Sequence, residues 1–196
     1  MASLYFYFSS MDSGKSTYLL QSAHNYQNAG KRVLLLAPVI DDRFGVGKIT
    51  SRIGLQSEAV AISQNDDLDQ QIAREHSGAH IACVMVDEAQ FLTPEQVWQL
   101  SDVVDVLGIP VLCFGLRTDA FGKAFAGSEV LLSIADELTE LKSICKCCEK
   151  KANMQLRLDG GGHPVKSGSQ VQIGGNDCYL SVCRKHYKLM MGRLES

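Results

Sequence analysis

Residues 9–16 constrain the fold of this chain more than any other stretch of its sequence. They spell Ser-Ser-Met-Asp-Ser-Gly-Lys-Ser, after the apolar run Leu4–Phe8 and before the helix-like stretch Thr17–Asn28. A strand, a tight loop and a helix N-terminus in this order are typical of a phosphate-binding loop, because successive backbone N–H groups and the helix dipole attract an anion. The consensus has glycine where this chain has Ser9, so the string alone leaves open a surface turn at 13–14.

In a phosphate-binding loop the polar side chains have expected roles. Lys15 would reach the β- and γ-phosphates of a nucleotide, and the hydroxyl of Ser16 would bind Mg²⁺. We therefore expect nucleotide phosphates to be bound by the whole stretch: Ser9, Ser10, Met11, Asp12, Ser13, Gly14, Lys15 and Ser16.

A pair of acids follows a later apolar run. Residues 81–86 are continuously hydrophobic and end on Asp87 and Glu88. In phosphate-transfer sites the first such acid holds Mg²⁺ directly or through its water, and the second acts as a base toward the acceptor. Acids at a strand end also serve as helix caps, but the phosphate-binding loop upstream favours the functional interpretation.

Buried strands alternate with helical segments along most of the chain, which predicts an α/β fold with a mostly parallel sheet flanked by helices. We expect strands at 4–8, 32–37, 81–86, 110–116 and 137–141, and helices at 17–28, 66–76, 93–107 and 128–135. After Lys142 the pattern changes to short strands and glycine-rich turns. The expected organisation is therefore a P-loop nucleotide-binding domain at 1–142 and a small second domain at 143–196.

Residues 41–57 interrupt the alternation with glycines, basic residues and no clear periodicity. We expect a mobile loop there. Its charge leaves two alternatives open, a solvated connector or a lid that brings Arg43, Lys48 or Arg52 to phosphates.

Two short motifs in the second domain have the spacing of zinc ligands. Cys145 and Cys148 form C-x2-C, and Cys183 and His186 form C-x2-H, which suits one tetrahedral Zn²⁺. Cys147 competes with Cys148, which we prefer because the x2 spacing is commoner; free thiols beside a surface histidine are the alternative. Such a zinc ion would be structural, because four protein ligands leave no open position and a small segment needs a cross-link.

Composition argues against several other classes of protein. The formal net charge is −3, which gives no help in holding a nucleic-acid backbone. The sequence has no apolar run near the roughly 18 residues of a membrane span, and its start carries no basic signal region. We expect a cytoplasmic protein that binds neither nucleic acid nor membranes.

Taken together, these motifs resemble the type II thymidine kinases, the cytosolic tetrameric kind, in their bacterial form. The resemblance covers essentially the full chain and is carried by residues 8–17, 41–45, 86–92, 115–119, 173–177 and 179–183 together with both zinc motifs. It implies a RecA-like P-loop sheet and a zinc-binding lasso domain that closes over a nucleoside. The implied reaction transfers the γ-phosphate of ATP to the 5′-hydroxyl of thymidine, with deoxyuridine as a further acceptor, giving dTMP and ADP in pyrimidine deoxynucleotide salvage.

The resemblance also implies residue roles. Glu88 would be the base that takes the proton from the 5′-hydroxyl, Asp87 would hold the water of Mg²⁺, and Arg43 would contact phosphate, which favours the lid. Gln90 would complete the ATP site. The nucleoside would be bound by apolar walls and by main-chain groups of the lasso: Met11, Phe91, Leu116, Phe125, Val171, Gln172, Ile173, Gly174, Gly175 and Tyr179. Feedback inhibition by dTTP and a homotetramer are implied in the same way.

One departure and one alternative accompany this interpretation. Relatives have an aromatic residue directly after Thr-Asp, whereas this chain has Ala120 there and Phe121 one place later, which puts one wall of the pocket in question. The alternative from another class is a P-loop ATPase whose zinc ribbon binds nucleic acid. Its contact surface would be a basic cluster, although such clusters are usually solvated: Lys146, Lys150, Lys151, Arg184 and Lys185.

Overall fold

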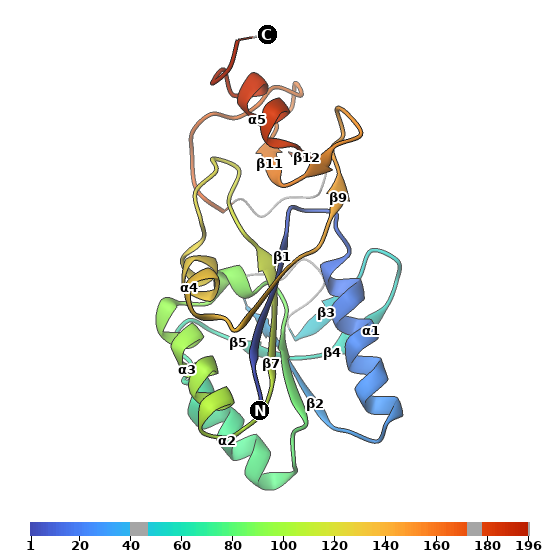
Figure 1. Cartoon of the computed structure of the whole chain (residues 1–196), viewed down its shortest axis with the longest axis vertical. Helices are drawn as coiled ribbons and strands as arrows, with labels where there is room; N and C mark the ends of the chain where they lie inside the picture. Colours follow the sequence, from blue (N-terminus) through green and yellow to red (C-terminus); the bar gives the residue numbers. More distant parts are fainter. Residues whose placement is uncertain (40–46, 172–177, 196) are drawn as a thin grey trace.

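The computed structural model describes residues 1–39, 47–171 and 178–195 of the chain (Figure 1). Its centre is a six-stranded sheet of order β5-β2-β6-β7-β1-β8, in which every neighbouring pair runs parallel. The strands are β1 (Leu4–Ser9), β2 (Val33–Pro38), β5 (Val60–Ile62), β6 (Cys83–Val86), β7 (Val111–Leu116) and β8 (Glu137–Glu140). The predicted α/β class with a parallel sheet is confirmed.

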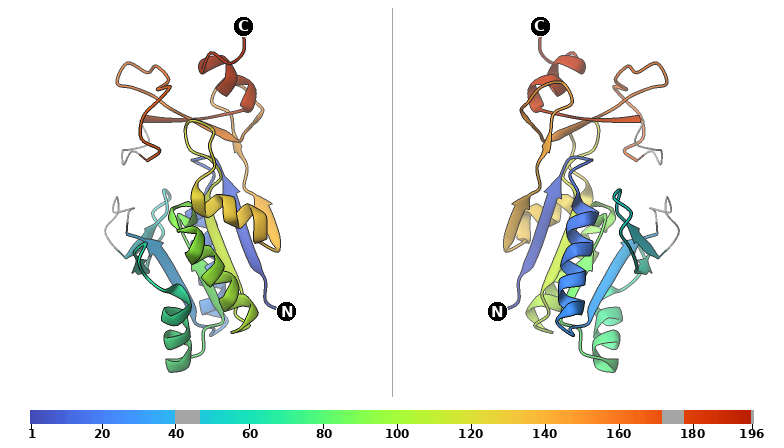
Figure 2. Two further views of the ribbon diagram at one scale, coloured as in Figure 1. Left: turned by 90° about the vertical axis from the view of Figure 1, so that its left-hand side faces the viewer. Right: turned by 90° about the vertical axis from the view of Figure 1, so that its right-hand side faces the viewer.

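Helices cover both faces of this sheet, as the opposed views of Figure 2 show. One face carries α1 (Lys15–Asn28), and the other carries α2 (Leu68–Gly78), α3 (Pro94–Asp105) and α4 (Ala126–Ile134). Strand β2 illustrates why both faces are apolar: Leu34 and Leu36 belong to the cluster beneath α2–α4, and Leu35 to the cluster beneath α1. Successive side chains alternate between faces, so a strand buried on both must be hydrophobic throughout.

The predicted start of α3 is confirmed in detail. The Thr93 side chain accepts a hydrogen bond from the backbone N–H of Gln96, and the Gln96 side chain accepts one from the backbone N–H of Thr93. This capping box satisfies two N–H groups that a helix end leaves unpaired. Gln96 is buried and also donates to the Ser63 carbonyl at 2.7 Å, which ties α3 to the segment after β5.

The prediction of an irregular loop at 41–57 is wrong for its second half. Residues 48–58 form a hairpin of β3 (Lys48–Thr50) and β4 (Gln56–Glu58), and β5, which was not expected, comes directly afterwards as an edge strand beside β2. Ile49 is fully buried against the α1 face of the core. Strands this short have no readable periodicity, so tertiary packing decides them. Residues 40–46, including Arg43, lie outside the described part.

A small module sits at the end of the sheet opposite the N-terminus (Figure 1). It contains β9 (Ser143–Ile144), β10 (Lys151–Ala152), β11 (Met154–Arg157), β12 (Tyr179–Val182) and α5 (Arg184–Met190), paired as β9–β10 and β11–β12. Its own apolar cluster has few buried members: Cys145, Ala152, Leu156, Val182, Cys183, Tyr187 and Met191. A core this small holds few elements together by burial alone.

Polar contacts join this module to the sheet domain. The Ser181 hydroxyl donates to the Met11 carbonyl at 2.8 Å, Gln155 donates to the Thr118 carbonyl at 2.8 Å, and the Tyr187 hydroxyl donates to the Ala120 carbonyl at 3.2 Å. The module is therefore seated on the loops after β1 and β7. None of the helices in the described ranges combines the length and the apolar character needed to cross a bilayer.

Candidate active site

The predicted phosphate-binding loop lies between β1 and α1, as its sequence indicates. Strand β1 ends at Ser9, α1 begins at Lys15, and Gly14 caps the helix in the left-handed conformation with φ 80°. Asp12 also has positive φ, 63°, which is uncommon for a residue with a side chain. The tight turn directs the start of α1, with its partial positive charge, into the space above the sheet.

Lys15 is buried, and its ammonium group folds back onto the loop. The Nζ atom donates to Ser9 Oγ at 3.0 Å and to the Ser10 carbonyl at 3.2 Å, while the Ser13 hydroxyl donates to the same Ser9 oxygen. Burial lowers the pKa of Lys15, and the carboxylates of Glu88 and Asp87 oppose that effect. Serine in the first loop position thus has a physical role, because its hydroxyl accepts from the lysine.

Asp87 lies at the end of β6 and faces the start of α1, although β7 separates β6 from β1 in the sheet. The Ser16 hydroxyl donates to Asp87 Oδ2 at 2.9 Å, and the Glu88 backbone N–H donates to Asp87 Oδ1 at 3.0 Å. Burial and the neighbouring charge of Glu88 raise the pKa of Asp87 to about 7. A hydroxyl and a carboxylate oxygen that meet in this way form a suitable pair of ligands for Mg²⁺.

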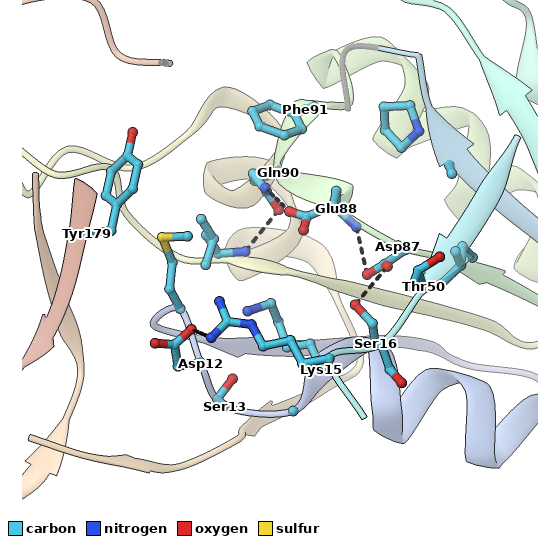
Figure 3. Close-up of a pocket in the computed structure, with 18 of the residues that line it drawn as sticks. Asp12, Ser13, Lys15, Ser16, Thr50, Asp87, Glu88, Gln90, Phe91 and Tyr179 are labelled. Carbon is cyan, nitrogen blue, oxygen red and sulfur yellow. Dashed lines mark hydrogen bonds and ion pairs between the residues drawn. The ribbon is translucent and has the colours of Figure 1, made fainter. Parts of the chain in front are cut away.

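Glu88 is held by Gln90, a residue that is only 2% exposed. Gln90 Nε2 donates to Glu88 Oε2 at 2.5 Å, and Gln90 Oε1 accepts from the Leu116 backbone N–H at 2.9 Å. A Cβ atom at Gly115 would come within 2.9 Å of Gln90 Oε1, so glycine leaves room for this amide. The backbone of Glu88 is left-handed, with φ 48°, at the start of the 3₁₀ turn Ala89–Phe91. Figure 3 shows Glu88 between Gln90 and Asp87, facing the cavity.

A cavity of about 370 Å³ connects the phosphate-binding loop to the small module. It is lined by most of the predicted site residues in the described ranges: Met11, Asp12, Ser13, Gly14, Lys15, Ser16, Asp87, Glu88, Gln90, Phe91, Leu116, Phe125, Val171 and Tyr179. Ser9 and Ser10 do not line the cavity, but they accept hydrogen bonds from Lys15, which does. The predicted residues Arg43, Gln172, Ile173, Gly174 and Gly175 fall outside the described part of the chain.

One end of the cavity is polar and the other is aromatic. Lys15, Ser16 and Asp87 lie at the polar end, whereas Tyr179 comes from the module opposite (Figure 3). The rings of Phe91 and Phe125 meet edge to face, with centroids 5.8 Å apart. The arrangement therefore offers space for a flat, partly apolar molecule next to a site for phosphate.

Several lining residues were not singled out from the sequence, among them Thr50 of the hairpin. Arg52, which the sequence offered as a lid residue, also lines the cavity and forms an ion pair with Asp12 of the phosphate-binding loop. Gln155 and Gln170 line the opposite wall. Their positions depend on which strand pairs with which, so local patterns contain no signal for them; the basic residues of 41–57 were the one hint that this segment approaches the loop.

The structure also shows where the departure after Thr-Asp leads. Ala120 is buried and lines the cavity. Phe121 packs instead against the apolar cluster of the small module, with the Arg157 guanidinium 5.1 Å above its ring. Ala120 therefore forms this part of the cavity wall, and the Phe121 ring packs in the small module instead.

The predicted zinc ligands come together in the small module. The ligand atoms of Cys145, Cys148, Cys183 and His186 lie within 4.8 Å of one another, and the Sγ atoms of Cys148 and Cys183 are 3.9 Å apart. Tetrahedral Zn–S bonds of about 2.3 Å place sulfurs at such separations. Cys147 is exposed and outside the cluster. The donor set therefore fits zinc. It contains Cys148, which the sequence spacing favours, and not Cys147.

The thiol of Cys145 in this cluster is suited to binding a metal. Burial acts to raise the pKa of Cys145, but hydrogen bonds involving the Cys183 and Cys147 backbone outweigh it and lower the pKa to about 6. The thiolate is the form that binds metal.

Comparison with known proteins agrees with this geometry. The family model described as "Thymidine kinase" matches residues 2–187. The thymidine kinase of Photobacterium profundum is 56% identical over 193 residues, covering 98% of this chain and 100% of the relative. The thymidine kinase of Escherichia coli O157:H7 is 57% identical over 196 residues, covering 99% and 95%, and that of strain K12 is 58% identical over 188 residues, covering 96% and 91%.

A phosphate-binding loop, an acid pair at the end of another parallel strand of the same sheet and a cavity for an acceptor define a P-loop phosphotransferase. With a match that spans nearly all of its length, the chain belongs to the thymidine kinase family.

Proposed function

We propose that the protein transfers the γ-phosphate of ATP to the 5′-hydroxyl of thymidine, giving dTMP and ADP, and accepts deoxyuridine as well. The observation that carries this proposal is the single cavity that runs from Lys15 to Tyr179 with Glu88 between its ends. A phosphate site and an apolar pocket must share one enclosed space if an alcohol, rather than water, is to receive the phosphate.

The polar end of the cavity would bind the triphosphate. Lys15 would exchange its contacts with Ser9 and Ser10 for phosphate oxygens, because its ammonium group already lies in the loop. Ser16 and Asp87 would hold Mg²⁺, which when bound supplies positive charge to the triphosphate. The ion pair between Arg52 and Asp12 brings a further cation to this end, and the predicted phosphate contact of Arg43 remains part of the proposal.

Glu88 would accept the proton of the acceptor hydroxyl as its bond to phosphorus forms. Gln90 supports this role through its hydrogen bonds to Glu88 and to the Leu116 backbone, which fix the carboxylate toward the cavity. The side chain of Gln90 is therefore better placed to orient the base than to meet phosphate. The ATP contact predicted for Gln90 stays a prediction.

The aromatic end would bind the base and sugar. Met11, Phe91, Leu116, Phe125 and Tyr179 line it and supply apolar walls. Val171 leads into the predicted lasso, whose residues Gln172, Ile173, Gly174 and Gly175 would read the base through main-chain groups. Zn²⁺ in the Cys3His cluster would stabilise the module from which this segment extends, away from the reacting atoms.

Regulation and assembly complete the proposal. Inhibition by dTTP fits a site that accepts a thymine nucleoside at one end and a triphosphate at the other. A homotetramer and a cytoplasmic location are proposed from the family resemblance. The P-loop ATPase with a nucleic-acid-binding zinc ribbon is less well supported, because Lys151 of the basic cluster pairs with Glu140 at 2.6 Å and the family is that of the thymidine kinases.

The test is transfer from [γ-³²P]ATP with Mg²⁺ to thymidine, deoxyuridine, deoxycytidine or no nucleoside, for wild type and Glu88→Gln. We expect labelled dTMP from wild type and a loss of about 100-fold or more in the variant, since glutamine keeps the shape but cannot accept the proton. Glu95→Gln, an exposed acid at the start of α3, is the matched control. Phosphate release that is equal with and without nucleoside would contradict the proposal.

A further inference from the structure

Arg157 is a buried cation beside the cavity that the proposed reaction does not use. It ends β11 opposite Tyr179 of β12, and it is only 4% exposed. It forms no ion pair with another residue of the described ranges, so its charge is compensated in other ways. Burying a guanidinium is costly, and a residue chosen only to fill the module's core would be apolar.

The Arg157 guanidinium contacts backbone carbonyls of residues 167–169, just before the cavity-lining residues Gln170 and Val171. We define Ser167–Val171 as the stem segment. Arg157 Nη1 donates to the Ser169 carbonyl at 2.9 Å, and Nη2 approaches the Ser167 carbonyl at 3.5 Å. The side chains of 167–170 are exposed, so little burial holds this segment in place. Its position therefore depends on the few polar contacts that reach it.

The fit between Arg157 and the stem segment is close. Gly168 has φ 141°, and a Cβ atom there would lie 2.6 Å from Arg157 Nη2. Only glycine combines this backbone conformation with the absence of a side chain. A larger residue here would have to adopt a disfavoured backbone conformation and also displace the guanidinium.

Phe121 also contacts the guanidinium. The Arg157 Cζ atom lies 5.1 Å from the Phe121 ring centroid, within the range of a cation–π interaction. Arg157 Nε has no hydrogen-bond partner among the described residues, so the aromatic face and the two carbonyls of the stem segment together compensate the buried charge. The Phe121 ring, which does not line the cavity, therefore helps to stabilise the buried guanidinium of Arg157.

A second set of hydrogen bonds joins the stem segment to Asp119 at the cavity. Gln170 of the stem segment donates to Asp119 Oδ2 at 3.1 Å, while Asp119 Oδ1 accepts the backbone N–H groups of Phe121 and Lys123, each at 2.9 Å. Asp119, Gln170 and Val171 all line the cavity. Arg157 is thus linked to the wall twice, through the stem segment and through Phe121.

We propose that Arg157 is a positioning residue for nucleoside binding: by holding the Ser167 and Ser169 carbonyls it fixes Gln170 and Val171 as the wall against which the base is bound. This inference rests on the proposed nucleoside end of the cavity. Arg157 does not line the cavity itself, so its effect on the nucleoside passes through the stem segment.

The test compares Arg157→Met and Arg157→Lys with wild type in steady-state kinetics, thymidine binding by calorimetry and zinc content per chain. Met keeps the apolar stem without the charge, and Lys keeps the charge without the fork that reaches two carbonyls. We expect both to raise the thymidine KM and Kd by about tenfold, with kcat and the ATP KM within about twofold and zinc content unchanged. Such a split is the signature of lost binding rather than lost chemistry.

Two controls make the result specific. Arg193→Met removes an exposed arginine of the same module that also stacks on an aromatic ring, 5.9 Å from the Tyr187 centroid, and should leave thymidine binding unchanged. Gly168→Ala places a methyl group against Arg157 and should raise the thymidine KM, whereas Gly162→Ala, which also has positive φ (80°) but nothing within 4 Å, should not.

The outcomes separate this inference from the function on which it rests. Unchanged thymidine binding in Arg157→Met and Gly168→Ala overturns the inference while wild-type transfer to thymidine stands. Equal losses in all kinetic parameters together with lost zinc also overturn it, since Arg157 would then be a fold-maintaining residue. Absence of thymidine phosphorylation by wild type would overturn the proposed function itself and the inference with it.

Discussion

The two ends of the cavity are held in place by different kinds of structure. At the phosphate end, Asp87 directly succeeds the buried strand β6, and Lys15 begins the helix that packs on the sheet, so the core of the whole domain fixes their positions. At the nucleoside end, Val171 and Tyr179 come from a small module with few buried side chains. The sheet fixes the first end. The position of the second end depends on individual hydrogen bonds and on the proposed zinc site of the module.

This difference teaches where single substitutions act. A change at the phosphate end leaves the scaffold intact and removes one chemical group. A change among the hydrogen bonds or the proposed zinc ligands of the module leaves the groups at the phosphate end in place and disturbs the wall proposed to bind the acceptor. The two ends should therefore separate in kinetics, with kcat sensitive to the first and the thymidine KM sensitive to the second.

The largest effect on the phosphate end is expected from Lys15→Met. Loss of the ammonium group removes charge stabilisation from the transferring phosphate, and kcat should fall by about 1,000-fold. Thymidine affinity, measured by calorimetry without ATP, should stay within about threefold of wild type because Lys15 is at the other end. A parallel loss of thymidine affinity would show that the two ends of the cavity are not independent.

Removal of a zinc ligand should have the largest effect on the nucleoside end. In Cys183→Ser the module loses its cross-link, and we expect zinc content to fall and thymidine affinity to drop by about 100-fold. ATP affinity should change by less than about threefold, since the phosphate-binding loop is part of the sheet domain. Cys147→Ser is the matched control, because Cys147 is exposed and outside the cluster; equal effects of the two variants would argue against the assigned ligands.

A smaller effect is expected from Gln90→Leu, which acts on Glu88 between the two ends of the cavity. Loss of the bond to Glu88 frees the base to turn, and kcat should fall by about tenfold with both KM values nearly unchanged. Gln90→Glu retains an acceptor for the Leu116 N–H but repels Glu88, so it should not rescue kcat. A loss confined to the ATP KM would instead support the direct ATP contact predicted for Gln90 from the family resemblance.

The elements predictable from the sequence are those whose evidence is local. The phosphate-binding loop, the acids after β6, the capping box of α3 and the cysteine pairs each have their signal within a few neighbouring residues. Long apolar runs identified the core strands for the same reason. The family resemblance then brought these separate pieces into one site and named residues that local patterns do not mark.

The parts that could not be predicted depend on contacts between distant segments. The β3–β4 hairpin is fixed by burial of Ile49 against the α1 face, and Gln90 is fixed by the Leu116 backbone of another strand. The sequence left open how Ala120 and Phe121 affect the pocket wall; in the structure the Phe121 ring contacts Arg157 of the small module. No pattern along one segment specifies a partner on another.

The left-handed backbone of Glu88 gives this site a further consequence, for stability rather than for catalysis. A side-chain-bearing residue at φ 48° and ψ 39° is less stable there than glycine by about 1 kcal/mol. The chain thus tolerates a conformational penalty at the position proposed for the catalytic base. Substitution of Glu88 by glycine is therefore expected to raise thermal stability while it removes the proposed base.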